Sequence, residues 1–187
     1  MSEAGTQIGI ARARAGIVAA AQPPDETAIR AALAEVPDPE LPMLSVVDLG
    51  IVHRVEIAPA DGSIRVEILP TFVGCPALDV ITSAMVTRLG AFGRPVTVAA
   101  TFEVPWTSER ISDRGRAALL AAGIAPPGHD DATASNPSTL IELEPRVPCP
   151  LCGSRRTVLE NAFGPTQCRT IRYCADCRQP FEAIKAI

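Results

Sequence analysis

The sequence predicts an α+β fold, in which a two-layer α-β-β-α-β-α domain precedes a small mini-domain with four cysteines. Apolar residues recur with helical spacing in two segments and alternate in three shorter runs. Near the C-terminus, four of the six cysteines form two Cys-x-x-Cys pairs. A chain of 187 residues with 47% hydrophobic residues has room for one ordinary domain and a mini-domain.

The chain begins with a segment that is predicted to be a flexible tail, residues 1–24, because its residues are small and rich in alanine and it ends in Pro23-Pro24. Asp25 is the expected N-cap of the first helix. Pro37 ends this helix and begins a stiff, proline-rich loop over residues 37–42. The apolar face of the helix consists of Ile29, Ala32, Leu33 and Val36.

Two alternating runs, residues 51–57 and 64–69, flank Asp61-Gly62, which predicts a β-hairpin. A second helix should begin at Pro76, and a third strand should follow Pro95. The last helix, capped by Ser108 or Ser112, should end before Gly123. These elements make up a predicted domain over residues 25–124.

A linker is predicted over residues 125–146, which are rich in Pro, Gly, Ser, Thr and Asp. The mini-domain then occupies residues 147–187. Residues 1–145 contain 10 basic and 18 acidic side chains, whereas residues 146–187 contain 7 basic and 3 acidic ones. An acidic body argues against a general nucleic-acid-binding protein, although the basic tail leaves a nucleic-acid-binding ribbon as a further hypothesis.

The two cysteine pairs, Cys149 with Cys152 and Cys174 with Cys177, have the pattern of a structural zinc ribbon. Two such turns can direct four sulfurs at one Zn²⁺ ion. The alternatives are a single iron ion, as in rubredoxin, and a pair of disulfides. The sequence shows no secretory signal and no apolar stretch that approaches a membrane span, so we expect a cytoplasmic protein with reduced thiols, although a weak organelle-type tail is an alternative.

Cys75 lies upstream of these pairs, at the predicted junction of the second strand and the second helix. If Pro76 is the first helical residue, Cys75 is the N-cap, where the helix dipole favours a thiolate that can bind metal. Gly74 would let the backbone approach a ligand closely. The alternative is a small apolar residue at a crowded turn.

Three carboxylates, Asp38, Glu40 and Asp48, belong to the proline-rich loop and its continuation, and would lie near Cys75 if that loop folded over the helix start. Carboxylates and one thiolate could hold iron or a cluster transiently, or the carboxylates could simply cap turns. Nucleophilic catalysis requires a base, but the two histidines fall in a strand and in the linker, at His53 and His129. We therefore expect no catalytic residues.

Two groups of residues resemble a known family. The first resembles the metal–sulfur cluster assembly domain of SufT-like proteins and consists of Asp38-Pro39-Glu40-Leu41-Pro42, Val47-Asp48-Leu49-Gly50 and Thr71-x-x-Gly74-Cys75-Pro76. The second resembles the PaaD branch, the D component associated with phenylacetyl-CoA epoxidase, and consists of Pro105-Trp106-Thr107, Gly123-Ile124-Ala125-Pro126-Pro127, Cys149-Pro150-Leu151-Cys152-Gly153-Ser154, Phe163-Gly164-Pro165-Thr166-x-Cys168 and Tyr173-Cys174-x-x-Cys177. The resemblance covers residues 25–187.

The resemblance implies an accessory protein of aerobic phenylacetate degradation that is not an enzyme by itself. It would help to assemble or maintain the diiron site of the oxygenase or the 2Fe–2S cluster of the reductase. Cys75 would be the thiol that handles iron or a cluster, with Asp38, Glu40 and Asp48 around it, and Cys168 would be a spare thiol, an alternative ligand or part of a transfer path. The implied partners are the oxygenase and reductase subunits or iron–sulfur assembly proteins, with no nucleic acid and no membrane. The rival function is electron transfer by rubredoxin-like iron.

Overall fold

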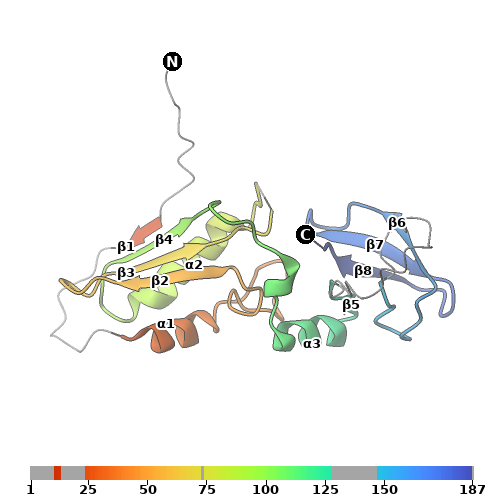
Figure 1. Cartoon of the computed structure of the whole chain (residues 1–187), viewed down its shortest axis with the longest axis horizontal. Coiled ribbons are helices and arrows are strands. Elements are labelled where there is room, and N and C mark those ends of the chain that lie inside the picture. The colour runs from red at the N-terminus through yellow and green to blue at the C-terminus, as the bar shows by residue number, and fades with distance from the viewer. Residues whose placement is uncertain (1–10, 14–23, 73, 128–146, 187) are drawn as a thin grey trace, which may run out of the picture. The chain divides into compact units, whose positions relative to one another are not determined.

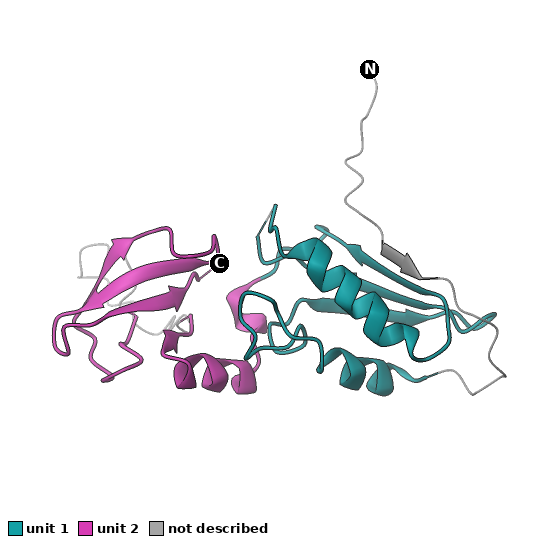
Figure 2. Ribbon diagram, turned by 180° about the vertical axis from the view of Figure 1, so that it is seen from behind, with its two compact units in different colours: residues 1–106 teal, residues 107–187 magenta. Residues whose placement is uncertain are grey.

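The computed structural model describes residues 11–13, 24–72, 74–127 and 147–186. The chain forms two compact units, Met1–Trp106 and Thr107–Ile187, coloured separately in Figure 2. Each unit contains its own four-stranded sheet. The predicted α+β class, with a cysteine cluster near the C-terminus, is confirmed.

The first unit is a sheet with two helices on one face (Figure 1). The sheet has the order β1-β4-β3-β2, in which β3 and β4 are parallel and both outer strands pair antiparallel. Helix α2 is the crossover that joins the two parallel strands. The elements are β1 (Ala11–Ala13), α1 (Glu26–Leu33), β2 (Val52–Ile57), β3 (Ile64–Ile68), α2 (Leu78–Gly90) and β4 (Val96–Ala100).

Local signals in the sequence account for several of these elements. The Asp25 side chain accepts the backbone N–H of Ala28 at 2.7 Å, which confirms the predicted N-cap of α1. Gly62 adopts φ +68° in the β2–β3 hairpin, a conformation that glycine reaches without steric cost. The helices and strands then bury a shared apolar core that includes Ile29, Leu33, Ile64, Val66, Ile68, Met85, Leu89, Val96 and Val98.

The other face of this sheet is polar. Arg54 forms ion pairs with Glu56 at 3.6 Å and with Glu67 at 3.8 Å, and Arg65 pairs with Glu67 at 3.4 Å. These side chains alternate with apolar residues that are partly buried along β2 and fully buried along β3, as expected for strands with one solvated face. The unit therefore has two layers, as predicted.

One strand of the first unit was not expected. The sequence predicted a flexible tail over residues 1–24, but residues 11–13 form β1, which pairs antiparallel with β4. Three residues are too few to show a period, and β1 is specified by the unpaired edge of β4 rather than by its own composition. The remaining residues of the predicted tail up to residue 23 lie outside the described part of the chain.

The second unit is built around a sheet in the order β5-β8-β7-β6. Here β5 and β8 are parallel, and the other neighbours are antiparallel. Ser112 caps α3 by accepting the backbone N–H of Gly115 at 3.0 Å, as predicted. The elements are the 3₁₀ helix η1 (Ser108–Arg110), α3 (Asp113–Ala121), β5 (Ile124–Ala125), β6 (Thr157–Asn161), β7 (Arg169–Cys174) and β8 (Pro180–Ile184).

The division between the units differs from the predicted domain boundary. The sequence placed residues 107–124 in the first domain and residues 125–146 in a linker, whereas the second unit begins at Thr107. Its sheet includes β5, which pairs with β8, so that residue 124 of the predicted first domain and residue 125 of the predicted linker both belong to this sheet. The buried guanidinium of Arg116 also donates hydrogen bonds to the carbonyls of Ser108 at 2.9 Å and Pro127 at 2.7 Å. Residues 128–146, most of the predicted linker, lie outside the described residues.

Within the described part of the chain, no helix has the length and apolar character that crossing a membrane requires.

Candidate metal centre and a separate cysteine

The four cysteines of the two pairs come together at one end of the second unit. Cys149 and Cys152 lie in the turn before β6, while Cys174 ends β7 and Cys177 lies in the turn that leads to β8. Their sulfur atoms all lie within 4.8 Å of one another. The Sγ atoms of Cys149 and Cys177 are 3.7 Å apart, and those of Cys152 and Cys174 are 3.6 Å apart.

These distances fit a tetrahedral metal site. Four Zn–S bonds of about 2.3 Å in a regular tetrahedron place the sulfurs about 3.8 Å apart. A disulfide would need an S–S distance of about 2.05 Å, so the pairs are not disulfides. The donor set is soft and fourfold, which suits Zn²⁺ or iron and leaves no open position once the metal is bound.

The two cysteine turns have the same backbone geometry. In the first turn, the N–H of Gly153 donates to the Cys149 carbonyl at 2.8 Å, and in the second the N–H of Arg178 donates to the Cys174 carbonyl at 2.9 Å. Gly153 has φ +75° and Arg178 has φ +59° at this equivalent position. A residue in the left-handed backbone conformation closes each turn, so that the two cysteines of the turn direct their sulfurs toward the same point.

The thiols of this cluster differ in acidity. Backbone N–H groups of Cys177 and Asp176 lower the pKa of Cys174 to about 6, so this thiol is ionised at neutral pH. Burial and the neighbouring thiol of Cys174 raise the pKa of Cys177 to about 12. The Ser154 backbone N–H lowers the pKa of Cys152, but desolvation and the Cys174 thiol outweigh it and the net shift is upward. The thiolate is the form of cysteine that binds metal, so a metal ion that bound here would displace the proton of Cys177.

A polar contact that the sequence did not predict joins the two turns. The Asp176 carboxylate, inside the second pair, accepts hydrogen bonds from Ser154 and Arg156, which follow the first pair. These contacts hold the pKa of Asp176 below its usual value. The N–H of Ala175 also donates to the Arg156 carbonyl at 2.9 Å. In the sequence, this contact was signalled only by the position of Asp176 between the second pair of cysteines and of Arg156 after the first pair.

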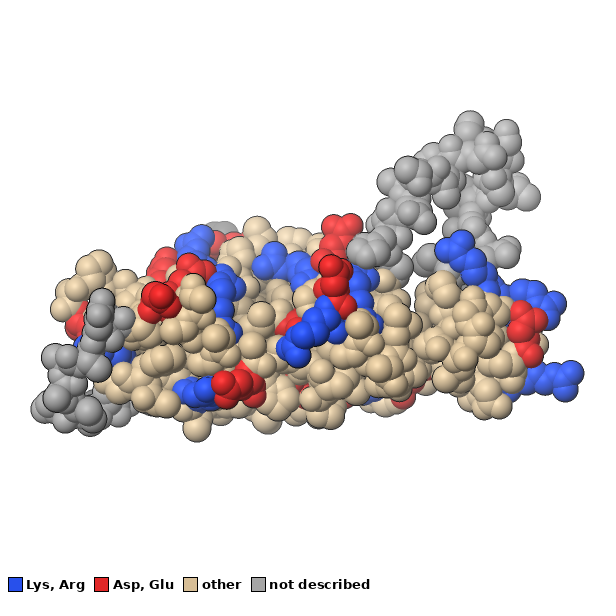
Figure 3. All heavy atoms as spheres, turned by 90° about the horizontal axis from the view of Figure 1, so that it is seen from below, with Lys and Arg blue, Asp and Glu red and all other residues tan. Residues whose placement is uncertain are grey.

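Three arginines follow the two cysteine pairs in the sequence. Arg155, Arg156 and Arg178 are all exposed, and Figure 3 shows Lys and Arg side chains gathered there. A divalent cation bound by four thiolates carries a net charge of about −2, so these arginines would offset the charge of a filled site.

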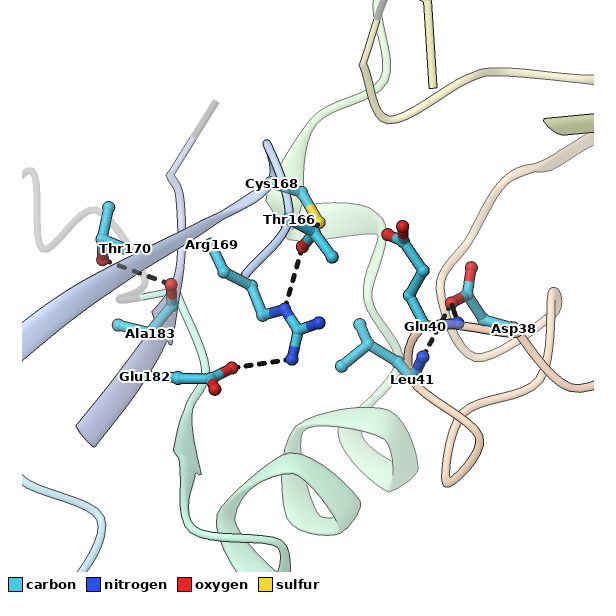
Figure 4. Close-up of polar contacts among 9 residues, drawn as sticks. All are labelled: Asp38, Glu40, Leu41, Thr166, Cys168, Arg169, Thr170, Glu182 and Ala183. Carbon is cyan, nitrogen blue, oxygen red and sulfur yellow. Dashed lines mark hydrogen bonds and ion pairs between the residues drawn. The ribbon is translucent and has the colours of Figure 1, made fainter. Parts of the chain in front are cut away.

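Cys168 does not belong to the cluster. It precedes β7, whereas Cys174 ends that strand, and six residues of strand separate their backbones by roughly 20 Å. The Cys168 sulfur lies 3.1 Å from the Thr166 hydroxyl, which accepts the Arg169 Nε–H at 2.9 Å (Figure 4). Arg169 also pairs with Glu182 at 2.7 Å. Cys168 is not among the four cysteines whose sulfur atoms lie together.

Cys75 lies in the loop between β3 and α2 and is half-buried. The prediction that it caps α2 was wrong, because α2 begins at Leu78 with Ala77 as its N-cap. The N–H of Leu78 donates to the Cys75 carbonyl at 3.2 Å, which closes a separate turn with Pro76 in second position, where proline is favoured. Gly74 adopts φ +79°, with open space where a side chain would point, so this loop exposes its backbone beside the cysteine.

The loop carboxylates bind their own backbone. Asp38 is buried and accepts the N–H groups of Glu40 and Leu41, both at 2.8 Å (Figure 4). Asp48 is buried and accepts the N–H of Ser45 at 3.0 Å and its hydroxyl at 2.6 Å. Glu40 is half-buried. The turn-capping alternative thus describes Asp38 and Asp48.

Cys75 and these carboxylates do not assemble into a metal site of their own. Among the described residues, the four-cysteine cluster is the one group of three or more Cys, His, Asp or Glu side chains with ligand atoms this close together. His53 is half-buried on β2, and His129 lies outside the described residues. The first unit therefore offers one thiol rather than a complete ligand set.

Asp38→Ala and Asp48→Ala should each lower the free energy of unfolding of the first unit by about 1–3 kcal/mol, since buried N–H groups lose their acceptor. Glu40→Ala is the matched control and should change it by less than about 0.5 kcal/mol. Urea titrations followed by the fluorescence of the buried Trp106, which belongs to this unit, would measure these differences. Equal effects of the three substitutions would contradict the capping role.

Comparison with known proteins agrees with this two-part chain. Residues 26–100 match the family described as "Iron-sulfur cluster assembly protein", and residues 133–185 match the "PaaD zinc beta ribbon domain". An Escherichia coli K12 protein, named as the putative D component of 1,2-phenylacetyl-CoA epoxidase, is 35% identical over 167 residues, which cover 88% of this chain and 95% of that protein.

Two solved structures are also similar to part of the chain. A domain of unknown function from Bacillus anthracis is 30% identical with a TM-score of 0.47 and covers 50% of this chain and 90% of its own. A conserved hypothetical protein from Thermotoga maritima is 30% identical with a TM-score of 0.45 and covers 52% of this chain and 96% of its own.

Proposed function

Because this chain belongs to the family of phenylacetyl-CoA epoxidase D components, we propose that it is an accessory component of that epoxidase system. It performs no turnover of its own. It helps to assemble or maintain the metal centre of a partner, either the diiron site of the oxygenase or the 2Fe–2S cluster of the reductase. The observation that carries this proposal is the match of residues 26–100 to an iron–sulfur cluster assembly family, within which Cys75 is the sole cysteine.

Under this proposal, the four-cysteine cluster and Cys75 have different roles. A structural Zn²⁺ ion is bound by the four clustered cysteines, Cys149, Cys152, Cys174 and Cys177. The distances between their sulfur atoms suit this ion, and the four thiolates fill all of its coordination positions. A closed site of this kind stabilises the second unit and exchanges nothing. Metal handling is left to Cys75 in the other unit.

A single thiol is better suited to passing on iron or a cluster than to holding it permanently. Iron–sulfur clusters are held by about four cysteine ligands, and Cys75 supplies one. Iron or a cluster bound there would need the remaining ligands from another protein, so it would stay labile and pass on readily. Half-burial of Cys75 and the open space beside Gly74 leave room for such a partner.

Co-expression tests the accessory role. The oxygenase and reductase of the cognate system should be produced with and without this chain, and their iron content per protein chain and epoxidase activity measured. We expect full iron content only with the chain, and expect that adding the chain to the purified, iron-loaded enzyme will not raise turnover. Equal iron content in both preparations would refute a maturation role, and a rise in turnover with loaded enzyme would make the chain a working part of the reaction.

A second candidate function is electron transfer through the second unit. The same four sulfurs fit a single iron ion, and Cys152 is exposed, so an electron could leave through that ligand. The two functions require different metals in the same site, zinc for the accessory role and iron for electron transfer.

A further inference from the structure

Three segments of the first unit meet at one edge of its sheet. Because β3 and β4 are parallel, the residues after each strand lie at the same edge, and β2 begins there because Val52 pairs with Ile68. The described parts of these segments are 37–51 before β2, 69–72 and 74–80 after β3, and 101–106 after β4, and Figure 1 shows them at the same end of the unit. The indole N–H of Trp106 donates to the Leu49 carbonyl at 2.8 Å and ties two of them together.

The exposed large apolar residues of this unit are concentrated in these segments. Among the described residues of the unit, Met43, Val80, Phe102 and Val104 are the large hydrophobic side chains classed as exposed, with 38%, 57%, 48% and 41% of their surface accessible. We refer to these four residues as the apolar rim. Cys75 belongs to the middle segment, and Val80 lies in the first turn of the helix that follows it. Exposed apolar residues scattered singly are ordinary, but a group that shares one edge indicates an interaction site.

The charge at this edge has one sign. The three segments contain no Lys or Arg, and they contain five acids. Two of these, Asp38 and Asp48, are buried and hydrogen-bonded to their own loop. Asp79 and Glu103 are exposed and Glu40 is half-buried, so the charge available to a partner is negative.

We infer that the apolar rim, with Glu40, Asp79 and Glu103, is the docking face for a partner protein that presents an apolar patch bordered by Lys and Arg. This inference rests on the proposed function, since the docked protein would be the one that exchanges metal with Cys75. Complementary charge speeds encounter and aligns the partners, and apolar residues at the centre supply most of the affinity. A second copy of this chain fits less well, because two acidic edges would face each other.

Binding of each purified component of the cognate epoxidase to the full chain tests this inference, with Kd and rate constants measured at low and at high salt. Phe102→Ser should weaken binding of one component about tenfold or more, mainly through faster dissociation. Glu103→Lys should slow association and reduce its salt dependence. The matched controls lie in the second unit, where Phe163→Ser removes a side chain that is 71% exposed and Glu160→Lys reverses an exposed acid. Both controls should bind like the unmodified chain.

Three results would overturn the inference. The first is that no component binds, or that the controls weaken binding as much as the rim substitutions. The second is that Phe102→Ser changes self-association in sedimentation, which would make a second copy the occupant. The third is that amide exchange at residues 101–104 is slow in the chain alone and becomes fast when residues 147–187 are cleaved off, which would make that part of the second unit the occupant.

The docking inference and the proposed function can fail separately. If Phe102→Ser binds normally while Cys75→Ser blocks iron loading, the docking face is wrong and the maturation role stands. If Cys75→Ser supports full iron loading while Phe102→Ser loses binding, the docking face stands and the thiol has no part in transfer.

Discussion

Replacing Cys75 with serine should reduce the iron content and activity of co-expressed epoxidase to the level obtained without this chain. Serine is close to cysteine in size, but its hydroxyl is a poor ligand for iron, so the variant removes the one thiol of the first unit. Cys75 is half-buried in a loop and lies outside both helices of its unit. We therefore expect the thermal midpoint of the variant to stay within a few degrees of that of the unmodified chain.

Cys168→Ser is the matched control for this experiment. Cys168 is also half-buried and outside the four-cysteine cluster, but it belongs to the second unit and contacts the Thr166 hydroxyl. This variant should support normal iron loading. Normal loading with Cys75→Ser would show that the thiol is dispensable, and a loss with both variants would place Cys168 on a transfer path.

Removing metal from the four-cysteine site should unfold the second unit while the first unit stays folded. One apolar cluster of this unit consists of Ala125, Val147, Cys149, Cys174, Phe181 and Ala183, so two of its six members are themselves proposed ligands. Structural zinc contributes about 10–16 kcal/mol in comparable small sites, more than so small a cluster can replace. Cys174→Ser should act like a chelator, since it removes a buried ligand.

Two intrinsic probes report on the units separately. The sole tryptophan, Trp106, lies in the first unit, and the sole tyrosine, Tyr173, lies on β7 of the second. Chelation should leave the Trp106 emission unchanged and remove the near-ultraviolet circular dichroism of Tyr173. A second unit that stays folded without metal would contradict this prediction.

The metal itself separates the two candidate functions. We expect a colourless protein with one zinc per chain, which Cys168→Ser should retain and Cys174→Ser should lose. A red protein that contains iron and is bleached by dithionite would instead favour electron transfer through the second unit.

Much of this protein is determined by short-range patterns in its sequence. Asp25 caps α1, Asp61-Gly62 forms the hairpin turn and Ser112 caps α3, because each acts on backbone groups within a few residues. The spacing of the Cys-x-x-Cys pairs likewise predicted a four-sulfur cluster, since each turn closes locally and positions two sulfurs at once.

The tertiary structure alone decided the features that depend on distant partners. Strand β1 forms because β4 has a free edge, and residues 124–125 belong to the sheet of the second unit because they pair with β8. Asp38 and Asp48 are candidate metal ligands in the sequence, and in the folded loop one oxygen of each carboxylate accepts hydrogen bonds from its own loop. Cys75 is not the N-cap of α2, because residues 75–78 form a separate turn before the helix. A pattern along the chain specifies hydrogen bonds between near neighbours, whereas strand edges, burial and surface charge depend on residues that only folding brings together.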